Sequence, residues 1–338
     1  MLKRIKRWLG GDAGNKDLPP VLETEHGKVR RVGVEIEFAG LAIEKIASIL
    51  KRDMGGSIET ISAYEYELRD TEFGTFGIEL DFAYLKKAGR KEGDDSALSN
   101  LEKMSDDLLA VIAKQLVPFE VVSPPLPMNR IGAFDQSLAS LKAAGAKGTR
   151  HATVYAFGLH LNPELPGTDA DTVRRYMQAF AVLFEWLKEV SDVDLSRRIT
   201  PYIEPWPREY LRKLVDVDYA PDQAQLIDDY LSDNPTRNRA LDMTPLFAEL
   251  DRPRLERHVQ DDRIKARPTL HYRLPNCEID QDNWSLMTAW RHWLAVERLA
   301  NDPQRLKQAC AEYSEFLDST VERLLGDWAK QGAKWAEA

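Results

Sequence analysis

Acidic residues alternate with apolar ones in three short segments, as a pair in two of them and singly in the third. Residues two apart in a β-strand point to the same face, so each segment would bury its apolar side chains and collect its carboxylates opposite. Five carboxylates share this arrangement: Glu35, Glu37, Glu79, Asp81 and Glu120. Carboxylates crowded on one face repel unless a cation lies between them. If these strands are neighbours, the pattern predicts one or two Mg²⁺ (or Mn²⁺) ions held over the sheet.

Two later segments place histidine, asparagine and arginine at positions of the same kind. His160 and Asn162 alternate with leucines, and His271 and Arg273 alternate with Leu270 and Tyr272. A guanidinium group suits bidentate recognition of phosphate. We therefore expect Arg273, together with Arg267 six residues earlier, to supply fixed positive charge for phosphates.

Each of these segments taken alone also fits a simpler interpretation. A half-buried strand can carry its charges in water, the arginines can form surface ion pairs, and His160 can be a hydrogen-bonded core histidine. Charged residues are poor strand formers, however. Because the pattern recurs in five segments, the simpler interpretation would have to hold for all of them at once, whereas a shared cation lets the five carboxylates lie together.

The whole-chain composition is that of an ordinary soluble protein. The 338 residues are 43% hydrophobic and 30% charged, and the net charge of −9 gives no footprint for general nucleic-acid binding. The sequence contains no apolar run of about 18 residues, so we do not expect stable membrane insertion. The basic start lacks the apolar core of a secretion signal. Cys277 and Cys310 have no metal-type spacing. A cytoplasmic location is expected, and the oligomeric state stays open.

Hydrophobic periodicity predicts strands early and helices late. We expect residues 1–28 to form a basic arm and linker, and 29–338 a single domain that ends in C-terminal helices over 283–338. The predicted strands are 31–38, 58–66, 75–82, 118–122, 153–162 and 269–274. The predicted helices are 41–51, one around 98–112, 130–143, one from about Asp169, 207–215, 222–231, 240–250, 283–299 and 303–328.

This order of elements favours an α+β fold with a largely antiparallel sheet. Strands that precede segregated helices are typical of that class. Alternating polar and apolar strand residues point the same way, because parallel strands covered on both faces are apolar throughout. We expect the helices to pack on the apolar face of the sheet.

Three motifs resemble the amidoligase family, which is grouped with glutamine synthetase and glutamate–cysteine ligase. They are Gly33–Phe38 (GVEIEF), Glu120–Leu126 (EVVSPPL) and Gly158–Asn162 (GLHLN), in the family's order. The resemblance spans 31–274 and is thin between 165 and 260, where Asn234–Leu246 matches only loosely. It implies a curved antiparallel sheet with a glutamine synthetase-like catalytic face that carries ATP and metal ions.

The resemblance also implies roles for individual residues. Glu35, Glu37 and Glu120 become metal ligands, His160 lies beside the metal or the phosphates, and Arg273 binds phosphate. Asp81 resembles the acidic residue of the third strand. Two departures stand out: Asn162 replaces a frequent second histidine, and His271 stands where the late strand often carries a carboxylate.

The expected activity is ATP-dependent amide formation between a small-molecule or peptide carboxylate and an amine. Phosphoryl transfer needs positioning and charge neutralisation, which metal ions and an arginine provide. No Walker-type glycine loop is present. Two alternatives remain open: a metal-dependent kinase or hydrolase acting on small molecules, or a degenerate domain that binds a nucleotide or peptide without catalysis. His271 and Asn162 favour the second alternative.

Overall fold

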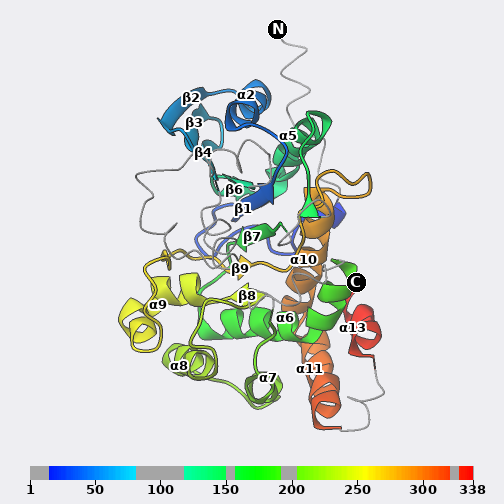
Figure 1. Ribbon diagram of the computed structural model, residues 1–338. Helices are drawn as coiled ribbons and strands as arrows, with labels where there is room; N and C mark the ends of the chain where they lie inside the picture. Colours follow the sequence, from blue (N-terminus) through cyan, green and yellow to red (C-terminus); the bar gives the residue numbers. More distant parts are fainter. Residues whose placement is uncertain (1–14, 81–117, 150–156, 192–203, 320–326, 338) are drawn as a thin grey trace, which may run out of the picture.

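The strands pair into one open antiparallel sheet. The computed structural model describes residues 15–80, 118–149, 157–191, 204–319 and 327–337. Its nine described strands are β1 (Arg31–Phe38), β2 (Ser57–Ser62), β3 (Glu65–Thr71), β4 (Gly74–Leu80), β5 (Phe119–Val122), β6 (Leu126–Pro127), β7 (Leu159–Pro163), β8 (Leu241–Asp242) and β9 (His271–Tyr272). They run in the order β2-β3-β4-β5-β1-β7-β9-β8, and β6 pairs with the start of β1 (Figure 1). The predicted antiparallel sheet is confirmed.

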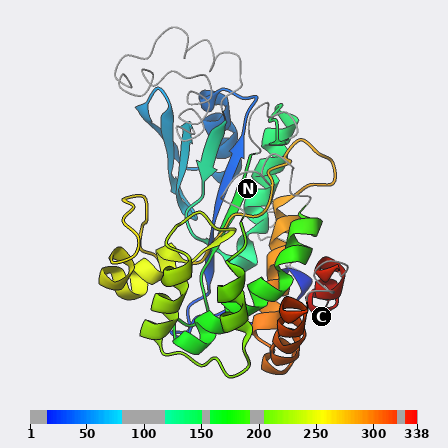
Figure 2. The same cartoon turned by 60° about the horizontal axis from the view of Figure 1, so that its bottom comes forward.

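The described helices gather mostly in the second half of the chain, as predicted. They are α2 (Ile43–Met54), α5 (Gly132–Ala143), α6 (Ala170–Val190), α7 (Arg208–Val215), α8 (Gln223–Asp233), α9 (Thr244–Glu256), α10 (Leu286–Ala300), α11 (Pro303–Asp318) and α13 (Trp328–Ala336), with short 3₁₀ turns η1 (Asn15–Asp17) and η3 (Met128–Arg130). Figure 2 shows α2 and α5 beside the strands and the later helices gathered at the other end of the molecule.

The apolar face of the sheet forms the core. In β1, Val32, Val34, Ile36 and Phe38 are fully buried, as period-2 alternation predicts. Helix α2 packs against β2, β3 and β4. In β9, the Tyr272 ring packs against aromatic rings of α6 and α10. Helices α2, α6 and α10 therefore pack on the apolar side chains of the sheet, opposite the acidic ones.

Several element boundaries differ from the prediction. The predicted strand 58–66 is a hairpin of β2 and β3, because the chain turns at Ala63 and Tyr64, which are not typical turn residues. The predicted helix 240–250 begins only at Thr244, after the short strand β8. The predicted strand 269–274 shortens to the two residues of β9, between prolines at 268 and 275.

Other differences concern helix ends and the segments outside the description. The predicted helix 303–328 ends at Asp318, and α13 begins at Trp328. The predicted helix around 98–112 and the first part of strand 153–162 lie outside the described residues. The described part of the predicted linker contacts the folded domain, because Trp290 Nε1 of α10 donates a hydrogen bond to the Asp17 carbonyl (2.9 Å).

Two predicted helix boundaries are confirmed by their caps. Helix α2 ends before Gly55, whose φ of 77° is the left-handed conformation that glycine adopts without strain. Helix α6 starts after Asp169, whose carboxylate accepts a hydrogen bond from the Thr172 N–H.

A buried ion pair joins the start of β1 to helix α10. Arg30 and Glu297 are both fully buried, and the guanidinium Nη2 lies 2.7 Å from Glu297 Oε1. Tyr176 of α6 and Trp293 of α10 donate to the same carboxylate. Burial and Glu297 raise the pKa of Tyr176 well above its usual value. This network fixes the strand that carries Glu35 and Glu37.

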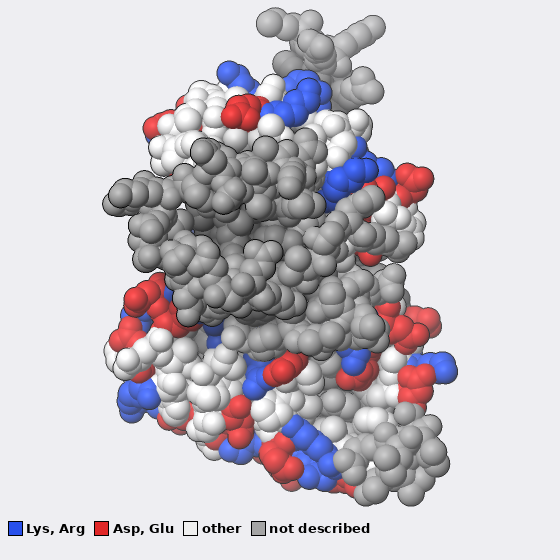
Figure 3. Space-filling model, in the orientation of Figure 1, with Lys and Arg blue, Asp and Glu red and all other residues white. Residues whose placement is uncertain are grey.

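The described surface carries charges of both signs. On the described part of the face in Figure 3, basic and acidic side chains are interspersed over the helical end of the molecule. Among the described helices, none has the length and apolar character needed to cross a membrane.

Candidate metal and phosphate site

Four carboxylates form one row across four neighbouring strands. Glu65 of β3 pairs with Glu79 of β4, Glu79 with Glu120 of β5, and Glu120 with Glu37 of β1. Directly paired residues of an antiparallel sheet share a face, with Cβ atoms about 5 Å apart. The acidic strands therefore do lie side by side, because β5 inserts between β4 and β1.

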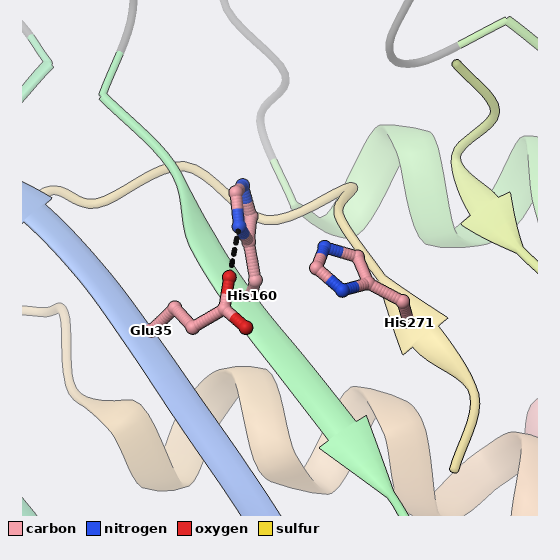
Figure 4. Close-up of side chains that lie close together, drawn as sticks. All are labelled: Glu35, His160 and His271. Atoms are coloured by element: carbon pink, nitrogen blue, oxygen red, sulfur yellow. Dashed lines mark hydrogen bonds and ion pairs between the residues drawn. The ribbon is translucent and has the colours of Figure 1, made fainter. Parts of the chain in front are cut away.

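A first cluster of possible metal donors combines Glu35, His160 and His271. Each contributes one atom, and these atoms lie within 4.8 Å of one another. Figure 4 shows the three side chains converging from β1, β7 and β9, with the His160 Nδ1–Glu35 Oε2 contact of 3.2 Å drawn as a dashed line. The ring centroids of the two histidines are 5.2 Å apart.

A second cluster combines Glu37, Glu120 and the same His160, again with donor atoms within 4.8 Å. The N–H of Gly158 donates to Glu37 Oε2 (2.8 Å), and this fixes the carboxylate beside the imidazole. A Cβ on Gly158 would stand only 2.7 Å from His160 Nε2. His160 therefore lies between the two clusters, in space that the missing side chain of Gly158 leaves free.

Asn162 orients Glu35. The residue is buried, and its Nδ2 donates to Glu35 Oε1 at 2.9 Å. A Cβ on Gly33, the directly paired residue of β1, would meet Asn162 Cβ at 3.4 Å. The side chain thus fills the space above Gly33 and holds a carboxylate in place.

The two predicted phosphate-binding arginines occupy different environments. Arg267 lies beside the first cluster, where its Nη2 is 3.0 Å from His271 Nδ1 and 3.7 Å from Glu35 Oε1. Arg273 forms a buried ion pair with Asp242 of β8, with 3.2 Å between Nη2 and Oδ2. Arg273 thus forms an ion pair, as the simpler interpretation expects, but the pair is buried and does not lie on the surface.

The electrostatics of the face favour a charged Glu35 and a neutral His271. Burial acts to raise the pKa of Glu35, but the hydrogen bond with His160 and the charge of Arg267 outweigh it and hold that pKa well below its usual value. Burial and Arg273 hold the pKa of His271 well below its usual value. A charged carboxylate and a neutral imidazole are the forms that bind metal ions.

Carboxylate crowding is also visible at the edge of the row. Burial and the neighbouring Glu65 raise the pKa of Glu79, while Lys265 acts in the opposite direction. Burial raises the pKa of Asp242, and Arg273 counteracts this effect. Loss of water and a neighbouring negative charge raise the pKa of a carboxylate, and a neighbouring positive charge lowers it. The shifts of Glu79 and Asp242 follow this rule.

Most of the predicted site residues come together on one face. The residues brought together are Glu35, Glu37, Glu79, Glu120, His160, Asn162, Arg267, His271 and Arg273. Glu79 belongs to the row but to neither donor cluster, and Asp81 lies outside the described residues. Sequence reasoning missed three participants. Glu65 could have been placed on the acidic face from its alternation with Tyr66, whereas no sequence pattern indicates a role for Lys265 or Asp242.

The close fit at Gly158 leads to a prediction. Replacing Gly158 with alanine should push the His160 ring aside and weaken divalent-cation binding by about 10- to 100-fold, which calorimetric titration with Mn²⁺ would measure. Gly77→Ala is the matched control, because a Cβ there meets only Val122 Cβ at an ordinary 3.8 Å. Equal affinities in the two variants would contradict the assigned position of His160.

The fold and the donor clusters define a mixed α/β protein whose antiparallel sheet carries a candidate metal site on one face. The sequence model described as "putative amidoligase enzyme" matches residues 28–295, most of the chain. The chain therefore belongs to this amidoligase family, as the motifs predicted. No curated protein and no solved structure matches it significantly.

Proposed function

We propose that the protein is an ATP- and Mg²⁺-dependent ligase that joins a carboxylate to an amine. Membership of the amidoligase family supports a ligase in general. The observation that carries the finer proposal is the meeting of Glu35, Glu37, Glu120 and His160 on one face. Arg267 and Arg273 stand beside them. This combination of anionic ligands and nearby cations suits a metal–phosphate complex.

The residues present fit a metal ion. Glu37 and Glu120 offer the hard oxygen ligands that Mg²⁺ prefers. Two buried polar atoms on the same face, His271 Nε2 and Asn162 Oδ1, have no hydrogen-bond partner among the described residues. A buried polar atom without a partner costs free energy, so its place beside the clusters supports a ligand there.

Each residue of the site has its own role in this proposal. Glu37 and Glu120 hold the cation, Asn162 keeps Glu35 oriented, and Gly158 keeps space open for His160. Arg267 has a side chain 36% exposed and can turn its guanidinium toward phosphate oxygens. Arg273 is held rigid by Asp242 and contributes its charge from a fixed position.

When bound, ATP would supply the phosphoryl group that turns the carboxylate into an acyl phosphate, from which the amine would displace phosphate, and Mg²⁺ would neutralise charge on the phosphates. Condensation of a free carboxylate with an amine is very slow in water because the leaving group is poor. The protein's contribution is to place the reactants and to stabilise developing charge with preorganised groups.

The test is ADP formation from ATP and Mg²⁺ with panels of amino acids and short peptides. The ligase proposal expects ADP only when both a carboxylate and an amine are present. Phosphorylation of a single substrate would instead identify a kinase, and product without ATP would identify a hydrolase. Failure to bind nucleotide with Mg²⁺ in calorimetry would identify a non-catalytic domain, and any of these three outcomes overturns the ligase proposal.

A further inference from the structure

The guanidinium of Arg267 contacts two of the three residues of the first donor cluster, His271 and Glu35. Its Nη2 is 3.0 Å from His271 Nδ1 and 3.7 Å from Glu35 Oε1. Arginine is always charged and can only donate, so the lone pair of His271 Nδ1 accepts. A metal ion that took Nδ1 of His271 as its ligand would need this same lone pair, and it would share the Glu35 carboxylate with Arg267. Arg267 therefore holds the position of a cation between its two donors.

The donors of this cluster are not those that Mg²⁺ prefers. Glu35 offers one carboxylate, while His160 and His271 offer two imidazoles. Mg²⁺ favours oxygen ligands, whereas imidazole nitrogen favours the divalent first-row transition metals. The second cluster, with Glu37 and Glu120, is richer in oxygen. The two clusters therefore differ in the class of metal that they suit.

We propose that Glu35, His160 and His271 bind a first-row transition-metal ion, and that this ion competes with Arg267 for their donor atoms. The inference rests on the proposed function, because it assigns a metal class to one part of the same site. It is nevertheless testable with neither nucleotide nor substrate present. His271 supplies the second imidazole of this cluster, and that nitrogen shifts the metal preference away from Mg²⁺.

The side chain of Arg267 is placed so that it can move away from the first donor cluster. Its side chain is 36% exposed, and its Nε has no hydrogen-bond partner among the described residues. The guanidinium is therefore held at the cluster through Nη2. An exposed side chain of this kind can swing toward solvent when a stronger cation takes its place. Its charge then becomes available for an anion such as phosphate.

The experiment titrates the full chain, treated first with chelator, with Co²⁺ and separately with Mg²⁺ by calorimetry, and follows Co²⁺ by its visible absorption. The wild type should bind Co²⁺ at least roughly 100-fold more tightly than Mg²⁺. Arg267→Gln removes the competing cation and should bind Co²⁺ about tenfold more tightly than the wild type.

Arg263→Gln is the matched control. It removes the same charge four residues earlier, where the guanidinium pairs with Asp261 instead (2.6 Å), and should leave Co²⁺ affinity unchanged. His271→Gln should lose about 100-fold or more in Co²⁺ affinity together with the absorption of nitrogen-bound Co²⁺. If that variant does not fold, His160→Gln removes the other imidazole and makes the same prediction.

Equal affinity for Co²⁺ and Mg²⁺ in the wild type would overturn the proposal, as would unchanged or weaker Co²⁺ binding by Arg267→Gln. Retention of full Co²⁺ affinity by folded His271→Gln would do the same. Tight Co²⁺ binding by a protein that forms no ADP would remove the ligase proposal and leave the metal site standing. The two proposals can therefore fail separately.

Discussion

Replacing Glu37 with glutamine is expected to abolish Mg²⁺-dependent nucleotide binding and to lower the rate of ADP formation by roughly 100-fold or more. Glu37 is one of two carboxylates in the second cluster. Glutamine keeps the shape and can still accept the hydrogen bond from the Gly158 N–H, so the fold should persist. The charge that attracts the cation is lost. Calorimetry with a nonhydrolysable ATP analogue and Mg²⁺ measures the effect.

Glu67→Gln is the matched control for this experiment. Glu67 also lies in the sheet, on β3, but its carboxylate pairs with Arg69 at 2.6 Å instead of joining a donor cluster. This variant should keep the nucleotide affinity of the wild type, and both variants should show the thermal unfolding of a folded protein. Wild-type affinity in Glu37→Gln would count against the whole site.

The largest expected loss of stability follows from Arg30→Met. Removing the arginine leaves Glu297 charged and fully buried with no cation beside it, which costs about 3–5 kcal/mol of unfolding free energy. The carbonyl of Glu164 also loses the hydrogen bonds that Arg30 donates. Chemical denaturation followed by tryptophan fluorescence would measure the change, because Trp293 lies in this network.

Two further variants separate the ion pair from simple packing. Arg31→Met changes the next residue, which is exposed, and should cost no more than about 0.5–1 kcal/mol. Replacing Arg30 with methionine and Glu297 with leucine together should recover part of the stability, because no buried charge is left alone. A double variant as unstable as the sum of the single changes would contradict this account.

The face on which each strand residue lies could be predicted from the sequence. In β1, β4 and β7 the polar residues alternate with apolar ones, and period 2 is a property of the local backbone. Once the apolar face was buried, Glu35, Glu37 and His160 had to share the opposite face. Family motifs added the expectation of metal ligands, which the convergence in space supports.

The neighbours of each strand could not be predicted in the same way. β5 follows β4 after a long stretch of chain and inserts between β4 and β1, so that Glu120 falls between Glu79 and Glu37. Strand pairing depends on contacts between residues far apart in sequence, and local pattern says nothing about them. The hairpin of β2 and β3 was missed because Ala63 and Tyr64 carry no turn signal.

The sequence by itself determined which side chains could do chemistry and to which side of a strand each one points, since residue type and alternation are local. Only the tertiary structure decided which of them meet. It placed His271 beside Glu35 and His160, put Arg267 on their donor atoms, and paired Arg273 with Asp242. Those meetings depend on the order and register of strands that the chain brings together from distant segments, and that long-range pairing has no local signature.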